Sequence, residues 1–198
     1  MNKNFKTSPL PFQGQKRRFV KPFKEALNGF SSDATYVDLF GGSGLLAHTV
    51  KQKYPEAKVI WNDYDNFIDR LAAIPQTNAL LAELRPILVD LPRKQRVSNE
   101  LRESVLKVIK AHETKHGYVD YVTLSGSLLF SAKYATNYDQ FANETLYNRV
   151  KLTDYNADGY LKGVERVQDD YKVLFNRYKS DTTVFLVDPP YLSTDTST

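Results

Sequence analysis

The chain has 198 residues, 27 Lys or Arg against 23 Asp or Glu, a formal net charge of +4 and 41% hydrophobic residues. This hydrophobic content with so little net charge excludes a disordered protein, and no apolar run reaches the ~20 residues that a membrane helix needs. The absence of cysteine from the sequence excludes a disulfide framework, a zinc–thiolate site and a cysteine nucleophile.

The N-terminal stretch is basic, with seven Lys or Arg against two acids in residues 1–33. Such clusters suit a phosphate-bearing partner. Residues 1–15 contain two prolines and a glycine without any period and predict an arm or loop. Residues 16–29 predict a helix, because large apolar residues recur there at every fourth position.

Residues 35–63 predict a strand, a helix and a second strand. Apolar runs at 35–40 and 58–63 flank a segment of helical character at 43–54. Connections of this length suit a parallel crossover, in which both strands run the same way in one sheet.

A mainly helical region rich in tyrosine is predicted next. Ser98 is expected to cap one of its helices, and the tyrosines are expected in partly buried core positions more than as wedges that face a ligand. A second basic stretch covers residues 91–115, with seven Lys or Arg and three acids. The predicted helices cover 66–75, 78–89, 98–115, 137–150 and 164–178, and the predicted strands cover 118–124 and 182–188.

Three glycines in four residues, Gly41, Gly42 and Gly44, follow the first strand. Glycine lets the backbone approach a ligand closely, and the carboxyl end of the first strand is a ligand-binding position in open α/β sheets. A P-loop is excluded because no Gly-Lys-Ser/Thr follows. The alternative is a plain glycine turn without a ligand.

Asp63 ends the second strand about twenty residues after the glycines. An acid at this position is well placed to accept hydrogen bonds from a ribose diol, in NAD as much as in S-adenosylmethionine. The alternative is an acid that caps the following helix.

The last predicted strand runs into Asp188, Pro189, Pro190 and Tyr191. The prolines stiffen the backbone and remove two N–H donors, so the Asp188 carboxylate and the Pro189 carbonyl can both accept hydrogen bonds. Together they would accept both hydrogens of an exocyclic amino group and localise its lone pair for attack. Tyr191 offers an aromatic face on which a planar base can stack. The alternative is a chance proline turn.

His112 and His116 share one helical face at i, i+4. Two imidazoles at this spacing can bind a metal, but three histidines in the whole chain favour two exposed polar residues near a helix end. We therefore expect no metal site.

The combination resembles the Dam-like D12 class of S-adenosylmethionine-dependent DNA adenine-N6 methyltransferases. The sequence from Phe40 to Gly44 is similar to the F-x-G-x-G motif of amino-methyltransferases, and Asp188–Tyr191 is similar to their D-P-P-Y motif. The segment from Pro11 to Lys16 resembles the G-x-K cofactor motif of the class. The order of these motifs resembles the alpha arrangement, in which a target-recognition region separates the cofactor half from the catalytic motif.

The resemblance implies a role for each matching residue. Asp38 would bind the amino group of the cofactor, Asp63 its ribose, and Lys16 would lie beside it. Asp188, Pro189, Pro190 and Tyr191 would hold a flipped adenine during direct methyl transfer, and the aspartate favours adenine over a cytosine N4 amine. The implied cofactor-binding residues are Phe12, Gly14, Lys16, Asp38, Phe40, Gly41, Gly42, Ser43, Gly44 and Asp63.

The expected fold class is α/β, with a Rossmann-like methyltransferase sheet and a largely helical insert. Residues 1–65 would form the cofactor-binding half, 66–180 the helical target-recognition insert, and 181–198 the catalytic strand and loop. The family sheet continues beyond D-P-P-Y, so we expect the C-terminal strands to be missing from this chain, which ends at Thr198.

The implied partner is double-stranded DNA, with Arg93, Lys94 and Arg96 as expected phosphate contacts. A cytoplasmic monomer, without a membrane partner and paired with a cognate restriction endonuclease, fits the resemblance. One alternative is a catalytically incomplete fragment that binds cofactor and DNA and needs a second chain or a missing C-terminus. Another is an NAD-dependent oxidoreductase, which leaves D-P-P-Y unexplained.

Overall fold

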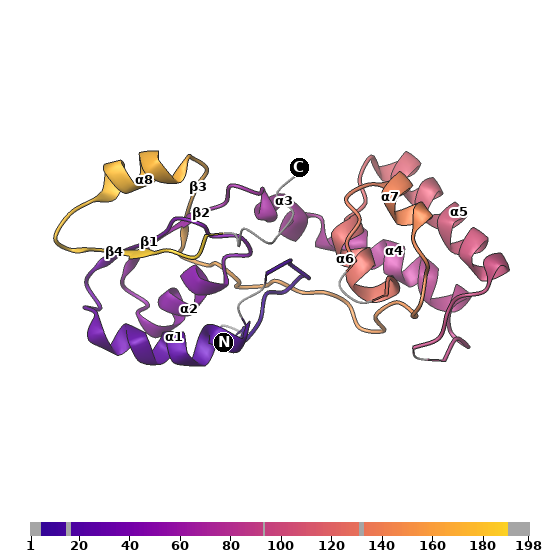
Figure 1. The fold of residues 1–198 in the computed structure, drawn as a ribbon, viewed down its shortest axis with the longest axis horizontal. Coiled ribbons are helices and arrows are strands. Elements are labelled where there is room, and N and C mark those ends of the chain that lie inside the picture. The colour runs from indigo at the N-terminus through magenta and orange to yellow at the C-terminus, as the bar shows by residue number, and fades with distance from the viewer. Residues whose placement is uncertain (1–4, 15–16, 93, 131–132, 190–198) are drawn as a thin grey trace. The chain divides into compact units, whose positions relative to one another are not determined.

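A computed structural model describes residues 5–14, 17–92, 94–130 and 133–189. The chain divides into two compact units. One unit contains the residues up to Ile68 and those from Ala157 onward, and the other contains Asp69–Asn156. The second unit is therefore an insertion in the sequence of the first (Figure 1).

In the described part of the first unit, four strands form one parallel sheet in the order β3-β2-β1-β4. The central strand β1 (Thr35–Asp38) pairs with β2 (Lys58–Asn62) and with β4 (Thr183–Leu186). The short strand β3 (Glu165–Val167) pairs with β2. The predicted mixed α/β class is confirmed.

Helices cover both faces of this sheet (Figure 1). Helices α1 (Val20–Ala26) and α2 (Leu45–Lys53) lie on one face, and α8 (Tyr171–Tyr178) lies on the other. Short 3-10 turns, η1 (Arg17–Phe19) and η2 (Leu27–Gly29), flank α1.

The strands bury side chains on both faces, because successive residues point to opposite sides of a sheet. Val37, Leu39 and Ile60 pack with Leu174 of α8 in one apolar cluster. On the α2 side, Tyr36 of β1 stacks on the ring of Tyr54, with ring centres 5.9 Å apart. The strands β1 and β2 consequently have mostly apolar residues, as the sequence pattern indicates.

The second unit is helical in its described residues. It contains α4 (Ile74–Ile87), α5 (Asn99–His116), α6 (Tyr121–Leu128) and α7 (Tyr138–Asn143), and α3 (Phe67–Ala72) crosses the boundary between the units. Helix α4 packs against α5. The buried apolar side chains of this core include Leu80, Leu84, Val105, Ile109 and Leu124.

Two helix starts follow simple rules, one for a capping side chain and one for proline in the first turn. The Ser98 hydroxyl accepts a hydrogen bond from Leu101 N at 3.3 Å, so the predicted cap of α5 is confirmed. Helix α4 begins at Ile74, one residue before Pro75, although a break was expected at that proline. Proline is tolerated in the first turn because its missing N–H has no intrahelical partner there.

The predicted strand at 118–124 is wrong, because α6 begins there. The buried Asp120 carboxylate caps α6 by accepting hydrogen bonds from Thr123 N at 3.0 Å and Thr123 Oγ1 at 2.7 Å. Arg70 Nε lies 3.1 Å from the same carboxylate. The aromatic and β-branched residues favour a strand locally, but the cap and burial against the helical core override that preference.

The predicted helix at 137–150 is too long, and the one at 164–178 is divided. Helix α7 ends at Asn143, and Leu146 then forms an isolated antiparallel bridge with Leu129. Residues 165–167 form β3, and Asp170 caps α8 by accepting from Lys172 N at 2.8 Å. The predicted insert at 66–180 therefore includes two elements of the first unit, the sheet strand β3 and the helix α8.

Candidate active site

The glycine turn and the aspartate of D-P-P-Y follow two adjacent parallel strands. Asp38 of β1 is level with Leu186 of β4, and Leu39 N donates to Leu186 O at 3.1 Å. Because the strands run the same way, both continue into loops at one edge of the sheet. This register places Gly41 and Asp188 at a common edge of the sheet. The two motifs must lie at one edge if they are to form one site.

Gly41 lies against the end of β2 without room for a side chain. A Cβ at Gly41 would collide with the Trp61 ring and would lie 2.7 Å from the Asn62 carbonyl oxygen. The turn is closed by Gly44 N, which donates to Gly41 O at 2.7 Å. Glycine is therefore required at this position by close packing of the turn on β2.

The other two glycines of the turn adopt backbone conformations that favour glycine. Gly42 has φ +45° and Gly44, at the N-cap of α2, has φ +72°. The half-buried Phe12 ring lies over Gly42, where it would contact an added Cβ at 2.9 Å. The predicted residue Phe12 is thus next to the turn, whereas Gly14 (φ +75°) is exposed and a Cβ added to it would meet nothing within 4 Å.

Asp38 is a buried acid at the end of β1, with a relative exposure of 1%. Neither carboxylate oxygen makes a hydrogen bond of normal geometry within the described ranges, although the backbone amides of Ala47 and Phe40 lie near enough to stabilise its charge. Burial raises the pKa of Asp38 to about 7, the nearby backbone amide of Ala47 opposes this, and the charge of Asp188 adds to it. A buried carboxylate of this kind is stabilised by a cation or by N–H donors from a ligand.

The raised pKa of Asp38 predicts that the protein loses stability as the pH rises. The unfolded chain loses this proton near pH 3.8 and the folded chain near pH 7, so the folded state binds more protons in between and the free energy of unfolding falls across that window. Asp38→Asn should flatten this dependence. Urea unfolding at about pH 5 and about pH 8 measures it, and an equal pH difference in both proteins would contradict the assignment.

Asp63 at the end of β2 is completely buried and already has three partners. Its Oδ1 accepts from Phe67 N at 2.6 Å, and its Oδ2 accepts from Ile68 N at 3.2 Å and from Arg166 Nε at 2.8 Å. The alternative interpretation, an acid that caps the next helix, is therefore present in the structure. A carboxylate has about four acceptor positions, so one remains.

Several residues at this edge were not predicted as site residues. Trp61 packs on Gly41, Tyr160 OH donates to Ser43 O at 2.8 Å, and Arg166 pairs with Asp63. Tyr160 and Arg166 are more than a hundred positions from their partners. Their stretch was expected within the helical insert, so no local signal assigned them to the unit that contains the sheet.

Asp188 is half-buried and Pro189 is exposed beyond the end of β4. The negative charge of Asp188 adds to the rise in the pKa of Asp38, after the larger effect of burial. Phe40 also lies at this edge, with its ring centre 5.1 Å from that of Tyr171. The predicted residues Lys16, Pro190, Tyr191 and Arg93 lie outside the described part of the chain.

The other predicted phosphate contacts lie in the helical unit, on the turn between α4 and α5. Lys94 and Arg96 are both exposed, and the backbone N–H of Lys94 donates to Asn148 Oδ1 at 2.9 Å. Arg96 also lines a surface hollow with Asn99 and Arg102. These cationic side chains are available to solvent, which a phosphate contact requires.

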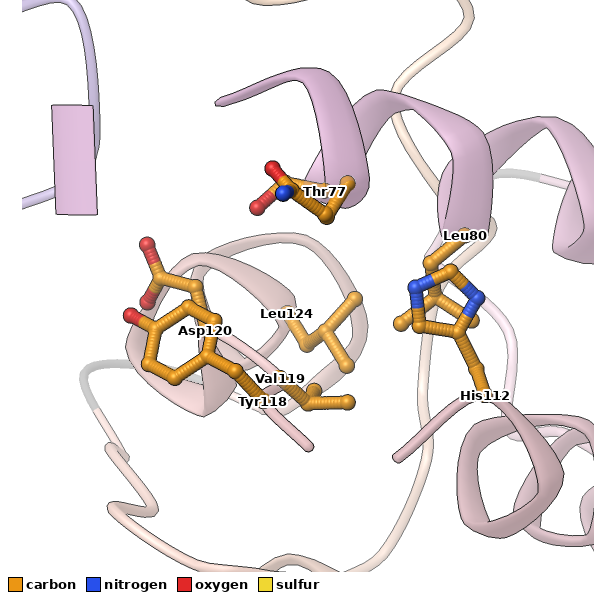
Figure 2. Close-up of a pocket in the computed structure, with 8 residues that line it drawn as sticks. Thr77, Leu80, His112, Tyr118, Val119, Asp120 and Leu124 are labelled. Carbon is orange, nitrogen blue, oxygen red and sulfur yellow. The ribbon is translucent and has the colours of Figure 1, made fainter. Parts of the chain in front are cut away.

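A shallow depression lies between α4, α5 and α6, and it encloses no space for even a water molecule (Figure 2). It is therefore no small-molecule site, since such sites are cavities of ~300–1,000 Å³. Leu80, His112 and Leu124 form part of its wall. His112 is buried, not exposed as expected, because its helix α5 packs against α4, where its Nδ1 lies 3.1 Å from Glu83 Oε1. Among the described residues, no group of three or more potential ligands could hold a metal ion.

No helix in the described chain has the length and apolar character to cross a membrane.

Comparison with known proteins agrees with the geometry of the sheet edge. A Haemophilus influenzae protein described as a "putative methyltransferase" is 39% identical over 203 aligned residues, which cover 97% of this chain and 66% of that protein. The family model of D12 class N6 adenine-specific DNA methyltransferases matches residues 12–198. The chain, with its glycine turn and its D-P-P-Y aspartate on adjacent parallel strands, therefore belongs to the D12 class of N6 adenine-specific DNA methyltransferases.

Proposed function

We propose that this protein transfers a methyl group from S-adenosylmethionine to the N6 amino group of an adenine at a specific site in double-stranded DNA. The observation that carries the proposal is the register of β1 with β4. It brings the glycine turn after Asp38 and the D-P-P-Y aspartate, Asp188, to one edge of a parallel sheet. Ligands in open α/β sheets bind at this edge.

The residues at this edge fit S-adenosylmethionine. The buried carboxylate of Asp38 makes no hydrogen bond of normal geometry among the described residues, and the amino group of the cofactor would supply both charge and N–H donors. The remaining acceptor position of Asp63 would take a ribose hydroxyl. The proposed cofactor-binding set is Phe12, Gly14, Lys16, Asp38, Phe40, Gly41, Gly42, Ser43, Gly44 and Asp63. When bound, the cofactor supplies an electrophilic methyl group on a sulfonium.

Asp188 and Pro189 would orient the adenine. The carboxylate and the prolyl carbonyl would accept the two hydrogens of the amino group, which localises the nitrogen lone pair for in-line attack on the methyl carbon. The N–C bond would form as the C–S bond breaks, which would leave the sulfur as a neutral thioether, and the proton that the amino group then loses would pass to solvent. Correct positioning is the main contribution of the protein, and the adenine must leave the duplex for it. Pro190 and Tyr191 would complete this adenine site.

The helical unit is the proposed target-recognition region. Its exposed basic turn carries Lys94 and Arg96 next to Arg93 in sequence, and phosphate contacts of this kind set the register of a protein on DNA. We place the activity in the cytoplasm, in a restriction–modification setting, on the resemblance alone.

A second candidate function is that of a module that binds cofactor and DNA without completing transfer. It is supported by strand β4, which has a sheet neighbour on one side only within the described residues. Beyond the end of that strand, Val187 is 63% exposed. An open strand edge is a place where further strands add.

Incubation of the chain with methyl-labelled S-adenosylmethionine and unmethylated DNA tests the proposal. We expect label in N6-methyladenine, identified by mass spectrometry of the digested nucleosides. Binding of both ligands without transfer would favour the second candidate, and label on cytosine would contradict the assignment of adenine.

A further inference from the structure

Residues 157–164, here called the return segment, lead from the helical unit back to β3. The segment is a series of turns, in which Tyr160 N donates to Ala157 O at 2.9 Å and Val164 N donates to Leu161 O at 3.1 Å. Leu161 has φ +57°, a conformation that residues with side chains rarely adopt unless their surroundings enforce it. The return segment is therefore held in a defined shape.

Tyr160 of the return segment contacts the glycine turn through a buried hydrogen bond. Its hydroxyl donates to the carbonyl oxygen of Ser43 at 2.8 Å, and both residues are buried. The Tyr160 ring packs against Phe5 and His48, with centres 5.1 Å and 4.7 Å apart. The hydroxyl is therefore aimed at Ser43 by a ring that is itself fixed on two sides.

The next residue of the return segment contacts the next residue of the turn. Leu161 Cδ2 lies 2.8 Å from the position that a Cβ on Gly44 would take. Gly44 is the N-cap of α2, and His48 N donates to Gly44 O at 2.8 Å in the first turn of that helix. Tyr160 and Leu161 thus restrain two consecutive residues at the junction between β1 and α2.

A turn with three glycines in four residues has a flexible backbone and needs restraint from outside to keep one conformation. Without the Tyr160 hydroxyl, the Ser43 carbonyl would lose its one hydrogen bond from this side chain, and the turn would sample more conformations. A binding site that must be ordered on binding has a lower affinity than one already in place.

We propose that Tyr160 is a positioning residue that holds the glycine turn in the conformation that binds S-adenosylmethionine. The proposal rests on the proposed function, because it concerns the affinity of the same site. Tyr160 itself does not touch the reacting atoms. It acts through the backbone of Ser43, so its effect should appear in cofactor affinity more than in the rate of the chemical step.

Tyr160→Phe removes one oxygen atom and keeps the packed ring. We expect the dissociation constant for S-adenosylmethionine, measured by calorimetry, to rise about 3- to 10-fold, the usual range for one buried hydrogen bond. The KM for the cofactor should rise by a similar factor while kcat changes little. The matched control is Tyr155→Phe, since Tyr155 is equally buried, lies in the helical unit and bonds Ser127 through its hydroxyl.

The two variants separate positioning from general stability. Both should lower the free energy of unfolding to a similar extent, but Tyr155→Phe should leave cofactor affinity unchanged. An unchanged dissociation constant in Tyr160→Phe, with normal binding by the unmodified protein, would overturn the positioning role and leave the proposed function intact.

Trp61 provides a second measurement that needs no cofactor. It is the single tryptophan of the chain, is buried, and packs against Gly41. Tyr160→Phe should increase quenching of its fluorescence by acrylamide, and Tyr155→Phe should not. If the unmodified protein fails to bind S-adenosylmethionine but Tyr160→Phe increases quenching, the proposed function is refuted, and what stands is that Tyr160 restrains the glycine turn. Unchanged quenching in Tyr160→Phe would count against positioning whatever the cofactor result.

Discussion

Asp188→Ala is expected to reduce methyl transfer to adenine by about 100-fold or more, the loss typical of removing one preorganised polar group from a reaction centre. The carboxylate stands at the end of β4, next in the sheet to the strand that carries the glycine turn. Without it, the amino group would lose one acceptor, so its lone pair would stay delocalised and its orientation would be less defined.

Single-turnover transfer from methyl-labelled S-adenosylmethionine measures this effect on the chemical step. Asp188→Asn should lose less activity than Asp188→Ala, because the amide keeps one acceptor oxygen. Asp181→Ala is the matched control, since Asp181 is an exposed acid that precedes the same strand at its opposite end. Transfer by Asp188→Ala at the rate of the control would remove Asp188 from the mechanism.

Gly41→Ala is expected to destabilise the sheet by about 1–3 kcal/mol, the usual cost of inserting a methyl group into a well-packed core. The added Cβ would meet the Trp61 ring and the Asn62 carbonyl oxygen. The carbonyl belongs to the backbone of β2 and cannot rotate away, so the turn and the strand must separate. Cofactor binding should weaken as well, because the turn itself moves.

Urea unfolding followed by Trp61 fluorescence and by circular dichroism measures the loss. Gly29→Ala is the matched control, because a Cβ at Gly29 has nothing within 4 Å and its backbone does not require glycine. That control should stay within about 0.5 kcal/mol of the unmodified protein, as surface substitutions usually do. Equal stabilities for Gly41→Ala and Gly29→Ala would show that the turn adapts and is not closely packed.

The sequence by itself determined the features that depend on neighbouring residues. The first crossover was predictable because its strands and helix have strong local patterns, and Ser98 was predictable as a cap because it precedes an apolar period. The motifs at Phe40–Gly44 and Asp188–Tyr191 were also sufficient for the family, because each combines an apolar strand with residue types that a simple turn does not need.

The tertiary structure decided the features that depend on distant residues. Strand β3 is three residues long, and only its pairing with β2 makes it a strand. Asp63 caps the helix α3 and also pairs with Arg166. The glycine turn accepts a hydrogen bond from Tyr160. Arg166 and Tyr160 both come from a stretch that was predicted to belong to the insert. Local propensity contains no information on which remote side chain a buried polar group will meet, because that partner is set by strand register and by the need to satisfy buried hydrogen bonds.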